Sequence, residues 1–108
     1  MAAHVMVVYT NPVAGREDEY NEWYNNVHLK EVLQTPGMIA ARRFSLVDGA
    51  GSGDEPQHRY LAIYELESED VKGTLKAMLG MPMNMSGAID TKNAFMRVWE
   101  ACSERVEA

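Results

Sequence analysis

The sequence comprises 108 residues, 46% of them hydrophobic and 24% charged, with a formal net charge of −6. These values predict one globular domain that spans residues 1–108. The acidic balance provides no basic patch for phosphates, and no apolar run reaches the ~18–20 residues of a membrane span, so neither nucleic acid nor a membrane is an expected partner. A single cysteine and the lack of a signal-peptide pattern favour a cytoplasmic location.

The first third of the chain predicts one strand and one long helix. Residues His4–Thr10 are β-branched and apolar, which is typical of a short buried strand. The segment Glu17–Gln34 has a helical period, and its first turn holds three acidic residues, which the helix dipole favours there. The helix is expected to end before Pro36, because proline disfavours helical geometry in the residue that precedes it.

The remaining chain predicts a hairpin, a second helix and a last strand. Residues 38–48 and 59–67 have a period of two, and the glycine-rich stretch 48–57 between them predicts an exposed loop. Ser68 is the expected N-cap of a short helix that ends near Gly80. Residues 92–102 again have a period of two. The order β-α-β-β-α-β predicts an α+β, ferredoxin-like fold, with a four-stranded antiparallel sheet and both helices on one face.

Both faces of the predicted sheet carry apolar side chains, as Ile39, Val47, Leu61, Ile63 and Met96 illustrate. A sheet that helices cover on one side only normally presents polar residues on the other side. A second copy of the chain is therefore expected to cover the second face, in a homodimer of two facing sheets.

The helix Glu17–Gln34 concentrates the polar chemistry of the chain. Residues three and four apart share a helix face, so one stripe is predicted to contain Tyr20, Trp23, Tyr24, Val27, His28 and Glu31. The stripe is apolar in body and polar at its tips, which indicates that this helix lines a pocket in addition to building a core.

The run W-Y-N-N-V-H-L-K-E-V-L-Q-T-P-G, followed by a strand, a variable loop and R-Y-L-A-I-Y-E-L-E, resembles the EthD-like members of the dimeric α+β barrel superfamily. The resemblance covers about residues 5–100. It implies a ferredoxin-like fold, a homodimer through facing sheets, and a pocket between sheet and helices in each subunit. The superfamily includes cofactor-free monooxygenases, polyketide cyclases, muconolactone isomerases and haem-handling proteins, so the resemblance does not select one reaction.

His28 and Tyr24 are the candidate catalytic residues. An imidazole titrates near neutrality, so His28 suits a general acid–base role in the pocket; the alternative is a half-buried histidine satisfied by a neighbour. Tyr24 and Tyr20 suit the orientation of a carbonyl or phenol through their hydroxyls, or they only pack. The sequence leaves these alternatives open.

An aromatic-walled pocket is predicted from the strands, on the assumption that their aromatic residues share the helix-facing side with Arg42. The candidate substrate-binding residues are Tyr9, Asn11, Tyr20, Phe44, Tyr60, Tyr64, Met78 and Trp99. For each, ordinary packing is the alternative, and for Asn11 it is a turn. Arg42 is expected to pair with Glu65 or Glu100, within the sheet or across the dimer; the alternative is that it binds an anionic group on a substrate. Met81, Met83 and Met85 are interpreted, with Met78, as an adaptable lid or as gap-filling in a small core.

These features predict a small enzyme that acts on an apolar aromatic or polyketide-like carbonyl compound by histidine-mediated acid–base chemistry, as a cyclase, isomerase, lyase or dehydratase. The first alternative is a non-catalytic protein that binds a small hydrophobic ligand, the second a cofactor-free monooxygenase, and the third a haem-degrading protein. No metal site is predicted, because the three histidines lack ligand spacing. No cofactor is expected.

Overall fold

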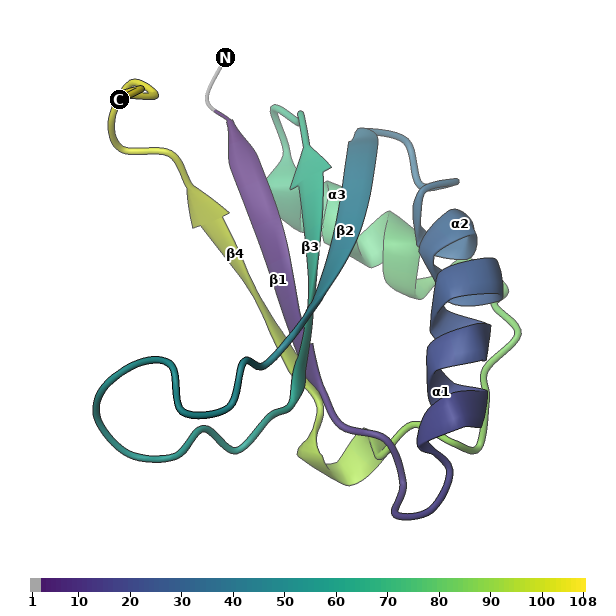
Figure 1. Cartoon of the computed structure of the whole chain (residues 1–108). Helices are drawn as coiled ribbons and strands as arrows, with labels where there is room; N and C mark the ends of the chain where they lie inside the picture. The colour runs from purple at the N-terminus through teal and green to yellow at the C-terminus, as the bar shows by residue number, and fades with distance from the viewer. Residues whose placement is uncertain (1–2) are drawn as a thin grey trace.

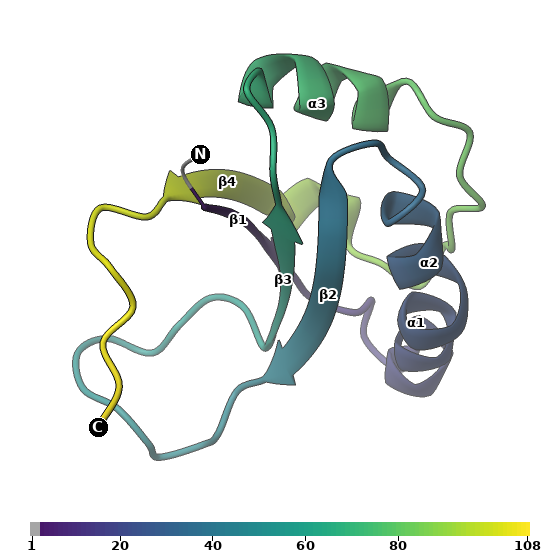
Figure 2. The ribbon, with the colours of Figure 1, turned by 90° about the horizontal axis from the view of Figure 1, so that it is seen from above.

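The structure is a computed structural model that describes residues 3–108 (Figure 1). One antiparallel sheet has the order β2-β3-β1-β4 and contains β1 (His4–Thr10), β2 (Met38–Ser45), β3 (Tyr60–Leu66) and β4 (Phe95–Glu100). On one side of it lie α1 (Glu17–Trp23), α2 (Leu29–Val32) and α3 (Val71–Leu79) (Figures 1 and 2). The predicted ferredoxin-like α+β fold is therefore confirmed. Within residues 3–108, no helix combines the length and apolar character that a membrane crossing needs.

The predicted helix Glu17–Gln34 is not one continuous α-helix. A π turn, Tyr24–His28, separates α1 from α2, and the N–H of Leu29 donates across it to the carbonyl of Tyr24, five residues back. The α-helical geometry ends at Val32, two residues before the predicted end. The extra residue in the π turn widens the helix at this point and changes which side chains share a face.

The second helix begins later than the sequence pattern predicts. Its N-cap is Asp70, whose carboxylate accepts a hydrogen bond from the N–H of Gly73 (3.0 Å), so the predicted N-cap Ser68 is wrong. The Ser68 hydroxyl instead accepts from the N–H of Asp70 (3.0 Å). A carboxylate at the N-cap both satisfies a free N–H and complements the positive end of the helix dipole.

The register assigns each strand residue to a face of the sheet. Met6 lies opposite Tyr64 in β3 and opposite Val98 in β4, so these three side chains share the helix-facing side. There they pack with residues from the helices into a buried core, whose largest side chains are Tyr20, Tyr24, Tyr64, Met6 and Leu66. On the opposite side, which we call the open face, residues 3–108 place no helix or second sheet (Figure 2).

The helix-facing position predicted for Tyr9, Phe44, Trp99 and Arg42 is wrong. Tyr9 lies opposite Phe95 on the open face, and the alternation of β2 and β4 places the other three there too. Phe44 and Trp99 are 42% and 56% exposed. The error has a simple cause: both phases of the alternation are apolar, and only the pairing register decides which one faces the helices.

Tyr60 and Tyr64 do lie on the helix-facing side, as predicted, because they pair with Thr10 and Met6. Within residues 3–108, Arg42 forms no ion pair with Glu65 or Glu100; its guanidinium lies 5.8 Å from the ring centroid of Phe44.

Candidate functional site

The π turn brings Trp23 and His28 together. Residues five apart point to different sides of an α-helix, whereas the wider π turn places them on the same side. The two rings are stacked, with centroids 4.6 Å apart and an interplanar angle of 19°. The ring of Tyr24 contacts the same imidazole edge-on, with the two ring centroids 5.0 Å apart. These contacts fix the plane of the His28 ring before any ligand arrives.

Glu31, one turn further along, faces the imidazole. Its Oε1 atom lies 3.9 Å from Nδ1 of His28, which is beyond hydrogen-bond length but within ion-pair range. Both atoms are buried, and neither has a hydrogen-bond partner. Burial lowers the pKa of His28, and the nearby Glu31 carboxylate opposes this only in part. The imidazole is therefore neutral at physiological pH.

An apolar cavity of about 370 Å³ lies beside His28, between the helix-facing side of the sheet and the helices. Its lining includes six of the eight methionines, namely Met6, Met78, Met81, Met83, Met85 and Met96. Among the described residues that line it, His28 and Tyr64 are the ones whose side chains carry nitrogen or oxygen. The volume falls in the range of small-molecule pockets, and methionine side chains adapt to ligands of different shape.

The hydroxyls of Tyr24 and Tyr64 remain protonated. Burial raises the pKa of Tyr24 to about 12 and raises that of Tyr64 as well. The Tyr20 hydroxyl is hydrogen-bonded to the hydroxyl of Thr10. The Tyr64 hydroxyl is buried without a partner, and Tyr64 lines the cavity. The neighbouring Tyr24 hydroxyl contributes to the raised pKa of Tyr64, so the Tyr64 hydroxyl lies on the side of Tyr24 and Tyr64 presents its ring to the cavity. Tyr24 packs against His28 and does not line the cavity.

The segment 81–85, which we call the methionine loop, covers one side of the cavity and is tied to the helix at Asn84. The Asn84 carbonyl accepts from Nε1 of Trp23 (2.6 Å). The Asn84 backbone N–H and side-chain amide donate to Oε2 of Glu31 (2.8 and 3.2 Å). The two residues that flank the imidazole of His28 thus also hold this loop.

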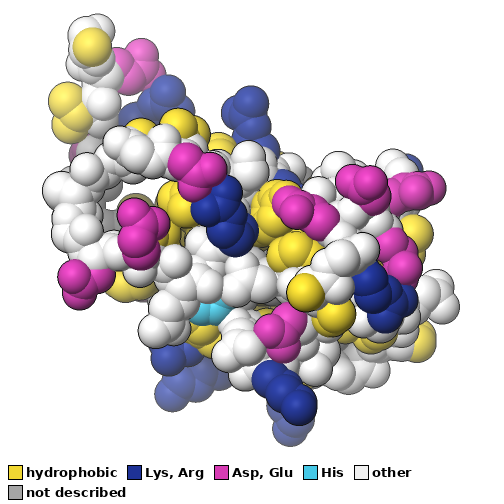
Figure 3. All heavy atoms as spheres, turned by 60° about the horizontal axis from the view of Figure 1, so that its bottom comes forward, with side chains coloured by type: hydrophobic (Ala, Val, Ile, Leu, Met, Phe, Trp, Pro, Cys, Tyr) yellow, Lys and Arg dark blue, Asp and Glu magenta, His cyan; other side chains and the backbone are white. Residues whose placement is uncertain are grey.

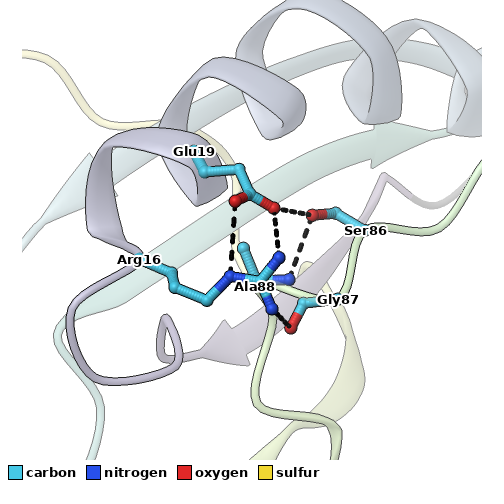
Figure 4. A network of polar contacts seen from close by, with 5 residues as sticks. All are labelled: Arg16, Glu19, Ser86, Gly87 and Ala88. Carbon is cyan, nitrogen blue, oxygen red and sulfur yellow. Dashed lines mark hydrogen bonds and ion pairs between the residues drawn. The ribbon is translucent and has the colours of Figure 1, made fainter.

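A second set of contacts fixes the chain just after the methionine loop (Figure 4). Nη2 of Arg16 donates to Oε2 of Glu19 (2.6 Å), and Nη1 donates to the carbonyl of Gly87 (3.0 Å). The Ser86 hydroxyl donates to Glu19 (3.4 Å) and accepts from the N–H of Ala88 (3.0 Å). The start of α1 therefore anchors the exit of the loop, and Trp23 and Glu31 anchor its middle.

Arg43 is a half-buried cation that was not predicted as a site residue. Its guanidinium donates to the side-chain carbonyls of Asn21 (2.9 Å) and Asn25 (2.8 Å), and it lies 4.4 Å from the ring centroid of Tyr24. The rings of Tyr20 and Tyr60 are 5.1 and 5.2 Å away. The consecutive pair Arg42 and Arg43 was an available signal, because alternation in a strand must direct one of the two toward the helices.

The structure brings together only part of the predicted site. His28, Tyr64 and Met78 line one cavity. Tyr20, Tyr24 and Tyr60 form the aromatic layer around Arg43. The Asn11 side-chain amide donates to the Gln57 carbonyl and accepts from the Arg59 N–H (2.8 Å each). Asn11 therefore holds the base of the β2–β3 loop, which corresponds to the structural alternative for this residue. Tyr9, Phe44 and Trp99 lie on the open face.

The open face has a depression of its own, beneath the β2–β3 loop. It measures about 690 Å³ and is lined by apolar and aromatic residues including Tyr9, Phe44 and Phe95. The rings of Tyr9 and Phe95 stack at 4.5 Å. Figure 3 shows hydrophobic side chains within the arch of the loop and acidic side chains along its outer rim. Within residues 3–108, no group of three or more His, Cys, Asp or Glu residues is arranged to hold a metal ion.

Comparison with protein-family models and with curated protein sequences finds no match. Solved structures do match. SnoaB, a cofactor-independent oxygenase from Streptomyces nogalater, has a TM-score of 0.61 at 11% identity, over 97% of this chain and 98% of that one. A haem-degrading protein from Mycobacterium tuberculosis has a TM-score of 0.57 at 17% identity, over 95% and 99%.

An ethyl tert-butyl ether D (EthD) family protein from Bacillus halodurans also matches, with a TM-score of 0.54 at 16% identity, over 94% of this chain and 99% of that one. The chain shares their fold. This agrees with the resemblance carried by the helix motif around His28. Because these proteins differ in their named activities, the likeness establishes the ferredoxin-like architecture and leaves the reaction to the chemistry of the site.

Proposed function

We propose that this chain is a small enzyme that acts, without a cofactor, on an apolar aromatic or polyketide-like carbonyl compound, with His28 as its general base and acid. The observation that supports this is a neutral, oriented imidazole at the wall of an apolar cavity. Because the pKa of His28 is lowered, the ring is ready to accept a proton at physiological pH.

Removal of a proton by His28 leads to several reactions. When His28 removes a proton next to a carbonyl, negative charge accumulates on the carbonyl oxygen. Return of the proton to another carbon gives isomerisation, attack on an internal electrophile gives cyclisation, and loss of a leaving group gives a lyase or dehydratase reaction.

A cofactor-free monooxygenase is the second candidate. The same deprotonation yields an electron-rich enolate or phenolate that reacts with oxygen directly, and the largely apolar lining of the cavity favours this by excluding water. One of the proteins that share the fold is named as a cofactor-independent oxygenase. Oxygen uptake with a bound phenol separates this reaction from isomerisation, cyclisation and elimination, which consume none.

The test measures turnover of a panel of bicyclic and tricyclic phenols and ketones by the native chain and by His28→Gln. Trp23 reports ligand binding by fluorescence, because it stacks on His28, and Trp99→Phe removes the emission of the open-face tryptophan. We expect His28→Gln to lower turnover by at least about 100-fold while ligand affinity changes less than about threefold. Loss of affinity with no turnover in the native chain would instead identify a binding protein, and full turnover in His28→Gln would refute the proposal.

We also propose that the open face is covered by a second copy of the chain. Its support is the row of exposed apolar residues on or beside this face, namely Ile39, Phe44, Val47, Phe95 and Trp99, each at least 42% exposed. Light scattering at micromolar concentration should give twice the chain mass of 12.1 kDa. Trp99→Asp should shift the mass to that of the monomer, and Lys76→Asp on α3 is the matched control. A monomer for the native chain would contradict the proposal.

A further inference from the structure

We propose that Glu31 is a positioning residue for His28: its carboxylate directs the imidazole proton to Nδ1 and stabilises the imidazolium that forms when Nε2 takes a proton from the substrate. This inference rests on the proposed acid–base role of His28. Glu31 entered the sequence analysis only as the polar end of a helical stripe, and nothing in the fold alone assigns it a role.

Two unpaired polar atoms carry the argument. Nδ1 of His28 and Oε1 of Glu31 are both buried without hydrogen-bond partners, and they face each other at 3.9 Å. Buried polar groups without partners are rare because each loses its hydrogen bonds to water on folding, so two that face each other call for an explanation in function. A proton on Nδ1 points toward the carboxylate, which leaves the lone pair of Nε2 for the cavity.

The carboxylate is itself held in place. Oε2 of Glu31 accepts from both the backbone N–H and the side-chain amide of Asn84, so Oε1 is the oxygen that remains for His28. Trp23 stacks on the imidazole and donates to the Asn84 carbonyl, so Asn84 connects the two residues that flank His28. The ring and the carboxylate are therefore oriented before the reaction, and little reorganisation accompanies proton transfer.

The proposed step is balanced within the site. A C–H or O–H bond of the substrate breaks, its electron pair stays on the substrate, and the proton forms an N–H bond at Nε2. His28 then carries a positive charge beside the negative charge of Glu31, and return of the proton to the product restores the neutral ring. Tyr24 and Tyr64 are the other titratable groups around the imidazole, and their raised pKa values keep both uncharged. Among the described residues, Glu31 is the charge that acts on His28.

The test uses Glu31→Gln, which retains an oxygen for Asn84 and removes the negative charge. Glu22→Gln is the matched control, because Glu22 is an exposed residue of the same helical segment. Nitrogen-15 NMR of the ligand-free protein reads the tautomer and the titration of His28 without any substrate. We expect the native ring to be protonated on Nδ1, and Glu31→Gln to lower the pKa of His28 further and to shift the ring toward the Nε2-protonated form.

In turnover, we expect Glu31→Gln to lower kcat about 10- to 100-fold with KM changed less than threefold, and Glu31→Asp to recover part of the loss. Near-ultraviolet circular dichroism checks the fold, and Glu31→Asp provides a second reading if the glutamine variant does not fold. An unchanged His28 titration and tautomer in both variants would overturn the role of Glu31. If these do change but His28→Gln retains full turnover, the positioning stands and the proposed function fails.

Discussion

The two faces of this sheet are built from similar residues but differ in what surrounds them. Both carry aromatic side chains and one arginine of the pair Arg42 and Arg43. On the helix-facing side, Tyr24 and Tyr64 are each 1% exposed, and the Arg43 guanidinium lies among aromatic rings. On the open face, Phe44 and Trp99 are 42% and 56% exposed, so a large part of each ring faces solvent.

Because of this difference, the helix-facing side suits acid–base chemistry and the open face suits association with a partner. Burial lowers the pKa of His28 and raises that of Tyr64, so the helix-facing side changes the properties of its ionisable groups. The open face offers apolar area to a partner, which is the property that association requires. Substitutions of similar residues on the two sides should therefore have different consequences for stability and association.

The largest expected effect is the truncation of a buried ring. Tyr24→Ala should lower the free energy of unfolding by about 3–5 kcal/mol, because it leaves a cavity in the core. Phe44→Ala should lower the folding stability of the chain itself by less than about 1 kcal/mol. Urea unfolding at several protein concentrations measures both values.

The concentration series adds a second reading of the same pair. Phe44→Ala should alter the concentration dependence of the unfolding midpoint, because it weakens the proposed dimer, whereas Tyr24→Ala should shift the midpoint equally at every concentration. Equal losses of stability for the two variants at high dilution would show that the faces are not different in kind.

Substitutions of the two arginines should differ less in their effect on stability than those of Tyr24 and Phe44. The comparison is better controlled, however, because the two arginines are neighbours in the sequence. Arg43→Lys should cost about 1–2 kcal/mol, since a compact ammonium lacks the planar fork that spans Asn21 and Asn25 and cannot lie flat on the ring of Tyr24. Arg42→Lys on the open face should cost less than about 0.5 kcal/mol. Thermal unfolding of both variants in one buffer is the measurement, and a larger loss for Arg42→Lys would reverse the assignment of faces.

The elements of the fold were predictable because each depends on local pattern. The strands have a period of two, the helices a period near 3.6, and glycine or proline stands near the breaks. The assignment of faces was not predictable from the same pattern. Tyr9, Phe44 and Trp99 were expected beside the helices because their alternation is as apolar as that of Met6 and Val98. Only the pairing between strands, a long-range property, separates the two sets.

The site was predictable in its histidine and not in the partners of that histidine. His28 is conspicuous on a helix rich in aromatic residues. The π turn shifts the helix by one residue, however, and no residue type marks it in advance. Because of that shift, the rings of Trp23 and His28 stack. Glu31, in the α-helical segment after the π turn, then faces Nδ1 of His28. Tyr64 was expected as one of several wall residues, and its ring lies among the residues that line the cavity.

The smallest expected effect is a pH dependence of stability that belongs to the helix-facing side. The pKa of His28 is lowered from its ordinary value of 6.5 in the folded chain. Between the two values the unfolded chain binds more protons, so the free energy of unfolding falls as the pH decreases through this window and is unaffected by His28 above it. The slope that one group contributes is below about 1.4 kcal/mol per pH unit.

The measurement is urea unfolding between about pH 5 and pH 8, above the range in which the exposed carboxylates titrate. His28→Gln should remove its share of the slope, and His58→Gln, which deletes an imidazole that packs on Phe95 at the open face, should leave that share in place. If both variants kept the native slope, burial of His28 would not govern its charge. A neutral imidazole at physiological pH, on which the acid–base proposal depends, would then need another cause, because desolvation is the main physical reason for it in this site.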